Sequence, residues 1–235
     1  MAFSILHISD LHRDPSDEVP NTCLLDSLAR DFEHFGTEEP EIRLPSLCVV
    51  SGDLVSGICP AGCDVDTELS RQYEQAEEFL IGLADRFFRG DRSAIVLVPG
   101  NHDICYGDVL RSATRIAIPD DPGQRQALVS EMQSPKTRLR WSWQEFCFYR
   151  ITDHSAYDSR FRHFARAYDR FYEGKRTFPP GSEKQYALFD FPQLSFCVLA
   201  LNSCHGTDPL RPTGAFDPAA LTEGCKAVRN TGRTG

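Results

Sequence analysis

Three short apolar stretches in the first half of the chain are predicted to be β-strands. They cover residues 3–9, 47–51 and 94–99, and each gives way to a short run of polar residues and glycine. The segments that separate them are long enough for the helical crossovers that usually connect parallel strands. The first half of the chain is therefore predicted to fold in the order β-α-β-α-β.

Both intervening segments carry apolar residues at helical spacing. The first opens at Asn21, a residue type that caps helices, and has Gly36 as its stop signal. The second opens at Asp66 or Thr67 and stops before Gly90. Its apolar face consists of Leu69, Tyr73, Ala76, Leu80, Leu83, Ala84 and Phe87. These faces are expected to pack against the sheet.

The second half of the chain begins with a segment of different character. Residues 104–185 are expected to form a largely helical, cap-like insertion within a single domain that spans residues 1–235. Residues 160–171 alternate arginines with aromatic residues, which is typical of an amphipathic helix with its aromatic face in the core. Strands resume at residues 186–191 and 194–201, which are predicted to form a hairpin that begins a second sheet.

Charge separates the same parts of the chain. The net charge is −9, yet residues 104–185 carry 10 acidic and 14 basic side chains, whereas residues 1–103 carry 20 acidic and 7 basic ones. Arginine dominates the basic segment, and its forked guanidinium suits phosphate oxygens. The densest cluster comprises Lys136, Arg138, Arg140 and Trp141.

Two interpretations of that cluster remain open. It could bind a polyanion such as nucleic acid, with Trp141 or Trp143 stacked on a base. Alternatively, the charged side chains lie on the solvated face of a helix and the aromatic ones pack inside.

Composition favours a soluble intracellular domain. No apolar run approaches the 18 residues of a membrane span, so we expect no association with membranes. Met1 leads directly into the first predicted strand and leaves no room for an export signal, which predicts a cytoplasmic location.

The cysteines agree with a reducing compartment. Nine of them, an odd number, are scattered along the chain and fit free thiols better than a disulfide framework. Cys59 and Cys63 form a C-x-x-x-C pair, and Cys105 lies further on. A zinc site there would need more ligands at close spacing, so these are interpreted as ordinary thiols near a crevice.

Residues that can bind metal ions follow each of the first three predicted strands. They are Asp10-Leu11-His12, Gly52-Asp53 and Gly100-Asn101-His102-Asp103. Ligands collect outside the carboxyl ends of strands in open α/β sheets, so these side chains should converge on one crevice. Carboxylate, amide and imidazole groups suit Mn, Fe or Zn, whereas the absence of thiolates argues against a structural zinc. Asp53 is placed to bridge two ions.

The three runs, in this order, resemble the D-x-H, GD and GNH[DE] signature of the calcineurin-like metallophosphoesterase superfamily. The resemblance implies an α/β fold in which two facing sheets form an α/β/β/α sandwich. It also implies hydrolysis of a phosphate ester by a metal-activated hydroxide at a site with two divalent ions. Asp10 and His12 would hold the first ion, Asp53 would bridge both, and Asn101 would hold the second.

The resemblance places His102 beside the phosphate. There it would stabilise the transition state or protonate the leaving group, with Asp103 able to orient its ring. The substrate class stays open among phosphorylated small molecules, nucleotides and nucleic acid, because the superfamily uses one metal site for all of them.

The chain departs from the family pattern after His102. The later histidine and the G-H-x-H that complete the family's site are absent from this sequence. We therefore expect the second sheet to be incomplete here and a complete protein to contain a further C-terminal segment. His205, which follows a predicted strand, either substitutes for a missing ligand or is a loop histidine. The alternative function is a non-catalytic fragment or binding module with an incomplete metal site.

Overall fold

The first half of the chain forms a parallel sheet in the computed structural model, which describes residues 2–59, 62–134, 137–211 and 213–233. Its strands are β1 (Ser4–Ile8), β2 (Pro45–Ser51) and β3 (Ile95–Val98), in the order β1-β2-β3. Both strand pairs are parallel. This arrangement confirms the predicted α/β fold.

Two crossover helices connect these strands and pack against one another. They are α1 (Asn21–His34) and α2 (Val65–Phe87). Asn21 was expected to cap α1, but it is the first helical residue, and its side-chain amide donates to the Gln75 carbonyl of α2 at 2.9 Å. The cap of α2 is Asp64, whose carboxylate accepts from the Thr67 amide at 3.2 Å, so the helix begins slightly before the predicted start.

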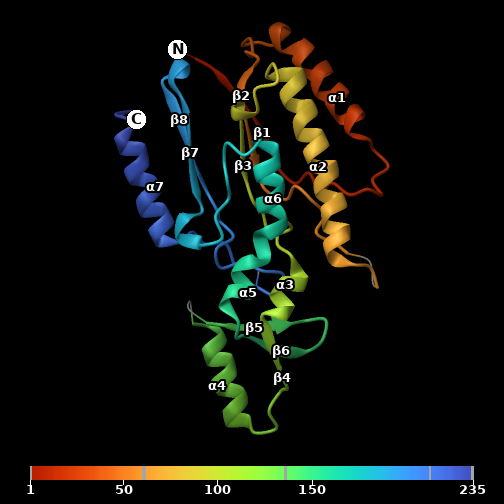
Figure 1. Cartoon of the computed structure of the whole chain (residues 1–235), viewed down its shortest axis with the longest axis vertical. Coiled ribbons are helices and arrows are strands. Elements are labelled where there is room, and N and C mark those ends of the chain that lie inside the picture. Colours follow the sequence, from red (N-terminus) through yellow and green to blue (C-terminus); the bar gives the residue numbers. More distant parts are fainter. Residues whose placement is uncertain (1, 60–61, 135–136, 212, 234–235) are drawn as a thin grey trace.

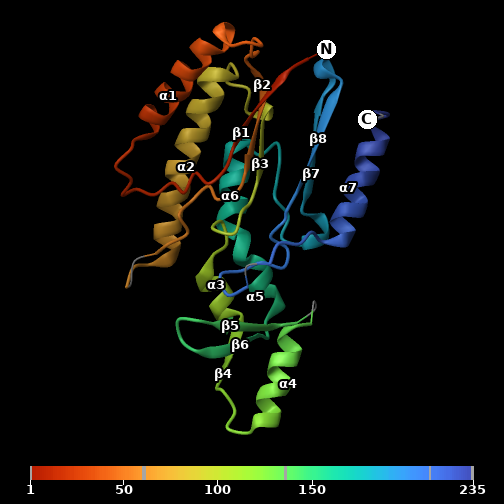
Figure 2. The same cartoon turned by 180° about the vertical axis from the view of Figure 1, so that it is seen from behind.

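A hairpin forms the second sheet of the sandwich. Its strands, β7 (Tyr186–Phe191) and β8 (Phe196–Leu201), are antiparallel, as the sequence predicted. Helix α7 (Pro218–Asn230) covers the side of the hairpin that faces away from the first sheet (Figure 1), and the reverse view shows the same order of layers (Figure 2). Within the described residues the second sheet consists of β7 and β8.

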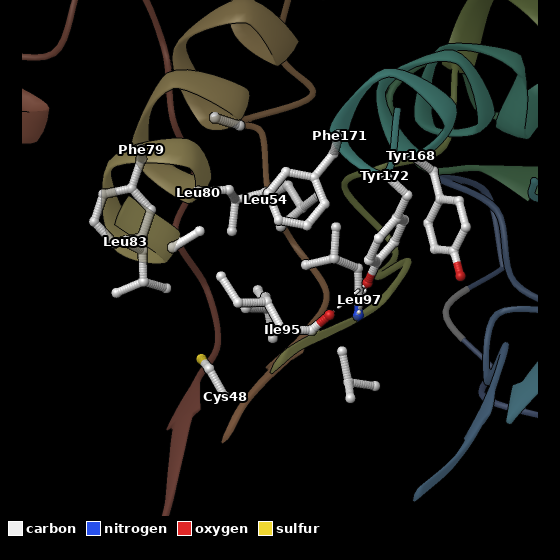
Figure 3. Packing of buried hydrophobic residues seen from close by; sticks show 14 of the residues in the cluster. Cys48, Leu54, Phe79, Leu80, Leu83, Ile95, Leu97, Tyr168, Phe171 and Tyr172 are labelled. Atoms are coloured by element: carbon white, nitrogen blue, oxygen red, sulfur yellow. Dashed lines mark hydrogen bonds between the residues drawn. The ribbon is translucent and has the colours of Figure 1, made fainter. Parts of the chain in front are cut away.

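The main core lies between α2, the first sheet and helix α6 (Arg162–Phe171). Phe79, Leu80 and Leu83 of α2 meet Ile95 and Leu97 of β3, while aromatic side chains approach from α6 and the residue that follows it (Figure 3). The aromatic side chains in question are Phe164, Tyr168, Phe171 and Tyr172, all buried. The Tyr172 hydroxyl donates to the Ile95 carbonyl at 2.6 Å. The predicted aromatic face of residues 160–171 is thus in the core.

The remainder of the segment 104–185 combines helices with a small antiparallel sheet. The helices are α3 (Tyr106–Arg111), α4 (Pro122–Met132) and α5 (His154–Asp158), and the strands are β4 (Ala113–Ile116), β5 (Leu139–Ser142) and β6 (Cys147–Ile151). The strand order is β4-β6-β5. These elements lie beyond the carboxyl ends of the parallel strands (Figure 1). No helix in the described part of the chain is long and apolar enough to cross a membrane.

Arg140 is not the phosphate-binding residue that the basic cluster suggested. It lies in β5 with a buried side chain, and its Nε donates to Asp208 Oδ2 at 2.5 Å. Its other nitrogens donate to the Tyr157 hydroxyl and to two carbonyl groups of its own segment. Arg138, which directly precedes β5, is exposed, and Lys136 lies outside the described residues. Arg140 therefore ties the small sheet to the loop that follows β8.

Replacing Arg140 with Ala is predicted to lower the free energy of unfolding by about 3–5 kcal/mol, because Asp208 would remain buried without its counter-ion. Urea denaturation followed by circular dichroism measures this change. The matched control is Arg138→Ala, at an exposed position two residues away, which should leave the unfolding midpoint unchanged. Equal midpoints for both variants would contradict the structural role of Arg140.

Candidate metal centre

The predicted site residues lie on three loops, each of which follows a strand of the parallel sheet. The loops after β1 and β2 continue the parallel pairing of their strands: the His12 amide donates to the Asp53 carbonyl, and the Arg13 amide donates to the Leu54 carbonyl, both at 2.9 Å. The loop after β3 joins them through the His102 amide, which donates to Asp53 Oδ1 at 2.9 Å. The three loops therefore meet at Asp53.

Three of the predicted residues come together closely enough to share a metal ion. His12, Asp53 and His102 each offer a ligand atom, and these atoms lie within 4.8 Å of one another. The two imidazole rings stand edge to face with centroids 4.4 Å apart. All three residues are half-buried, so they remain accessible from solvent.

The other two predicted ligands lie at the edge of this group. Asp10 Oδ1 is 3.7 Å from His12 Nε2, a separation that two ligands of one ion can span, but the Asp10 side chain is 67% exposed. Asn101 is exposed and lines the pocket beside His102. The structure thus gathers His12, Asp53 and His102 and leaves Asp10 and Asn101 at the rim.

Backbone strain is concentrated at the same residues. Asp10, His12 and Asp53 have φ values of 55°, 46° and 52°, in the left-handed region that non-glycine residues rarely adopt. Such conformations cost on the order of 1–3 kcal/mol each and persist where the surrounding contacts impose them. Three strained residues on two adjacent loops indicate that the contacts at the site, and not the intrinsic backbone preference of these residues, set their conformations.

The two glycines of the motifs are required by the close approach of the loops. A Cβ on Gly52 would lie 2.6 Å from the Cα of Gly100, and Gly52 itself has a φ of 98°. A Cβ on Gly100 would overlap both the carboxylate and the backbone nitrogen of Asp53. Glycine at these positions allows the loops after β2 and β3 to touch, which brings Asp53 and His102 together.

A backbone carbonyl orients the ring of His102. Nδ1 lies 2.7 Å from the Ser56 carbonyl oxygen. Because a carbonyl can only accept, Nδ1 carries the proton, and Nε2 is left for a metal ion or a substrate. Sequence reasoning missed Ser56, since a carbonyl group leaves no trace in residue type.

Asp103 does not orient that ring, contrary to expectation. Its buried carboxylate accepts from the Gly100 amide at 2.8 Å, from the Leu54 amide at 3.2 Å and from the Tyr73 hydroxyl at 3.1 Å. Burial raises the pKa of Asp103 to about 6, although the hydrogen bonds oppose this rise. Asp103 therefore joins the loops that carry Asp53 and His102 to helix α2.

His205 lies apart from the group formed by His12, Asp53 and His102. It is on the loop after β8, where its amide donates to the Ala215 carbonyl at 3.2 Å and its Nδ1 lies 3.9 Å from Asp217 Oδ2. Within the described residues the structure gives it no place among the gathered ligand atoms.

A pocket of about 570 Å³ opens beside His102. Its walls come from the loops after β2 and β3, from the β5–β6 turn and from the loop after β8. They consist of Ser56, Gly57, Ile58, Cys59, Asn101, His102, Ile104, Tyr106, Gln144, Thr207, Asp208 and Pro209. None of these described residues is Lys or Arg. Gln144, Thr207 and Asp208 were not foreseen, because only the folded chain brings them to the site.

An α/β/β/α sandwich with carboxylate and imidazole groups at the strand ends is an arrangement suited to a metal-dependent hydrolase. The chain matches the family model of the calcineurin-like phosphoesterases over residues 3–197, a range that contains Asp10, His12, Asp53, Asn101 and His102. The chain therefore belongs to the calcineurin-like phosphoesterase family, whose members use divalent metal ions. A search of curated proteins and a search of solved structures each found no match.

Replacing Gly100 with Ala is predicted to weaken Mn²⁺ binding by about tenfold or more, because the added Cβ would push Asp53 out of place. Calorimetry on chelator-treated protein measures the affinity. The control is Gly36→Ala, where an added Cβ meets nothing within 4 Å, and this variant should bind like the unchanged chain. Equal affinities for both variants would show that the contact between the two loops does not position Asp53.

Proposed function

We propose that this protein hydrolyses phosphate esters with two divalent metal ions held at the strand ends. The observation that supports the proposal most directly is that His12 and Asp53, two proposed ligands, and His102, the proposed catalytic residue, bring their donor atoms within 4.8 Å of one another. Membership of the calcineurin-like phosphoesterase family supplies the reaction class.

The donor set fits such ions. Asp10, His12 and Asp53 would hold the first ion, and Asp53 with Asn101 would hold the second. Oxygen and imidazole donors of this kind suit Mn, Fe or Zn. When bound, the ions supply Lewis acidity and lower the pKa of a coordinated water. Asp10, His12 and Asp53 all have left-handed backbone conformations, which the contacts between their loops hold in place.

His102 is the proposed catalytic residue. The Ser56 carbonyl accepts a hydrogen bond from Nδ1 and so fixes the ring. Nε2 is then the nitrogen that remains available to the substrate. In the cationic form the ring would stabilise negative charge on the phosphate and give its Nε2 proton to the departing oxygen. Its half-buried position beside the pocket allows both roles.

The pocket favours a small phosphate ester or a nucleotide over a nucleic-acid strand. Its volume of about 570 Å³ is in the range of small-molecule sites. No cationic side chain is among the described residues that line it, and Arg140 is occupied by Asp208. Polyanion binding relies on exposed Lys and Arg along a surface, and this pocket wall provides none.

Turnover of an aryl phosphate ester at saturating Mn²⁺ tests the proposal. We expect His102→Gln to lower kcat by about a hundredfold or more, the usual contribution of acid–base catalysis. His154→Gln is the matched control, because His154 is an exposed histidine in α5. Turnover that survives in His102→Gln would refute the catalytic assignment. Tight metal binding without turnover would favour the binding-module alternative.

Competition experiments test the substrate class. An oligonucleotide is expected to inhibit hydrolysis of the aryl ester no better than a mononucleotide at equal phosphate concentration, because the pocket wall carries no cationic side chain. Its inhibition should also change little with salt. Strong inhibition that falls steeply between low and physiological salt would show that the segment 104–185 binds a polyanion after all.

A further inference from the structure

A second group of metal-binding residue types lies away from the candidate metal centre. Asp66 is in the first turn of α2, Cys105 precedes α3, and His163 is in the first turn of α6. Each offers one ligand atom, and these atoms lie within 4.8 Å of one another. Cys105 and His163 are buried, whereas Asp66 is reached from solvent. This group contains a thiol, which the group at the strand ends does not.

We propose that Asp66, Cys105 and His163 bind a zinc ion. Thiolate, imidazole and carboxylate together are a typical donor set for zinc and a poor one for magnesium, calcium or manganese. His163 Nε2 lies 3.3 Å from Asp66 Oδ1. Two such atoms, each about 2.0–2.1 Å from a tetrahedral ion, would be about 3.3–3.4 Å apart. The pair therefore has the separation of two ligands that share an ion, and the same two atoms can also form a hydrogen bond.

The fourth position is left to solvent, which reaches the group from the side of Asp66. Zinc sites with three protein ligands keep this position open. Cys59 is not among the gathered ligand atoms, although burial, with the nearby thiols of Cys63 and Cys105, raises its pKa to about 11.

The surroundings of Asp66 resemble the outer contacts of a metal ligand. Arg162 forms an ion pair with Asp66 and also donates from Nε to the buried Asp108 at 2.7 Å. Metal-binding carboxylates are commonly held in this way by a second hydrogen bond, which fixes their orientation. The simpler interpretation is an ion-pair network around Arg162 with no metal, and the experiment below separates the two.

The site would stabilise one wall of the substrate pocket. Tyr106, which follows Cys105 in the chain, lines that pocket together with His102. A zinc ion between Asp66, Cys105 and His163 would join the start of α3 to the starts of α2 and α6.

Cobalt provides a probe that reports thiolate ligands directly. The chelator-treated chain of residues 1–235 is titrated with Co²⁺, and the near-ultraviolet sulfur-to-cobalt charge-transfer band is recorded. The proposal predicts this band in the unchanged chain and its loss in Cys105→Ser. Asp66→Asn, at an accessible position, should weaken cobalt binding at this band by about tenfold or more. Circular dichroism confirms that each variant is folded, and Asp66→Asn provides the test if Cys105→Ser is not.

Two controls separate this site from the one at the strand ends. His12→Gln removes a ligand of the candidate phosphoesterase centre and should leave the charge-transfer band in place. Cys147→Ser alters a buried thiol in β6 and should also retain it. Absence of the band in the unchanged chain, or its loss in His12→Gln, would overturn the proposal. So would a band that Cys105→Ser and Asp66→Asn leave unaltered.

Discussion

The buried carboxylate of Asp103 is the interaction on which the geometry of the site depends. It accepts hydrogen bonds from the loop after β2, from the loop after β3 and from Tyr73 of α2. Buried polar groups that lose a partner cost on the order of 1–3 kcal/mol each, so this three-way contact resists separation of the loops. Because Asp53 and His102 lie on those two loops, the distance between them follows from the placement of Asp103.

The loops around this contact are strained, and the strain accompanies the close approach of the site residues. Asp10, His12 and Asp53 adopt left-handed backbone conformations, and Gly52 and Gly100 lie so close that neither tolerates a side chain. The rigid parallel sheet beneath makes this possible, since buried residues such as Leu47, Val50 and Ile95 hold the strand ends in fixed positions. A site at the ends of packed strands is better defined than one built on free loops.

The segment between β3 and β7 serves two separate physical purposes. Its last helix, α6, belongs to the main core through Phe164 and Phe171, so it is part of the sandwich and not an appendage. Its small sheet, by contrast, is fastened by the buried pair of Arg140 and Asp208 and contributes Gln144 to the pocket. Part of the basic charge of this segment is therefore buried in ion pairs, such as that of Arg140 with Asp208, and is not available on the surface.

Local patterns in the sequence were sufficient to predict the parallel sheet, its crossover helices, the hairpin and the family. Apolar runs with periods of two and 3.6 residues specify these elements locally, and the D-x-H, GD and GNHD runs in this order indicate the family. It did not reveal α7, although Asp217 followed by Pro218 is a helix-start signal, with Asp217 accepting from the Ala219 amide at 2.8 Å.

Which side chains contact one another could be learned only from the folded chain. The Ser56 carbonyl on His102, the Asp208 carboxylate on Arg140 and the approach of His163 to Cys105 all join residues between 46 and 68 positions apart. Such contacts depend on how helices and sheets pack, and residue type carries no record of them. The same holds for Asp103. Its position next to His102 in the sequence suggested that it orients the imidazole ring. In the folded chain its carboxylate instead accepts hydrogen bonds from two backbone amides and from the Tyr73 hydroxyl.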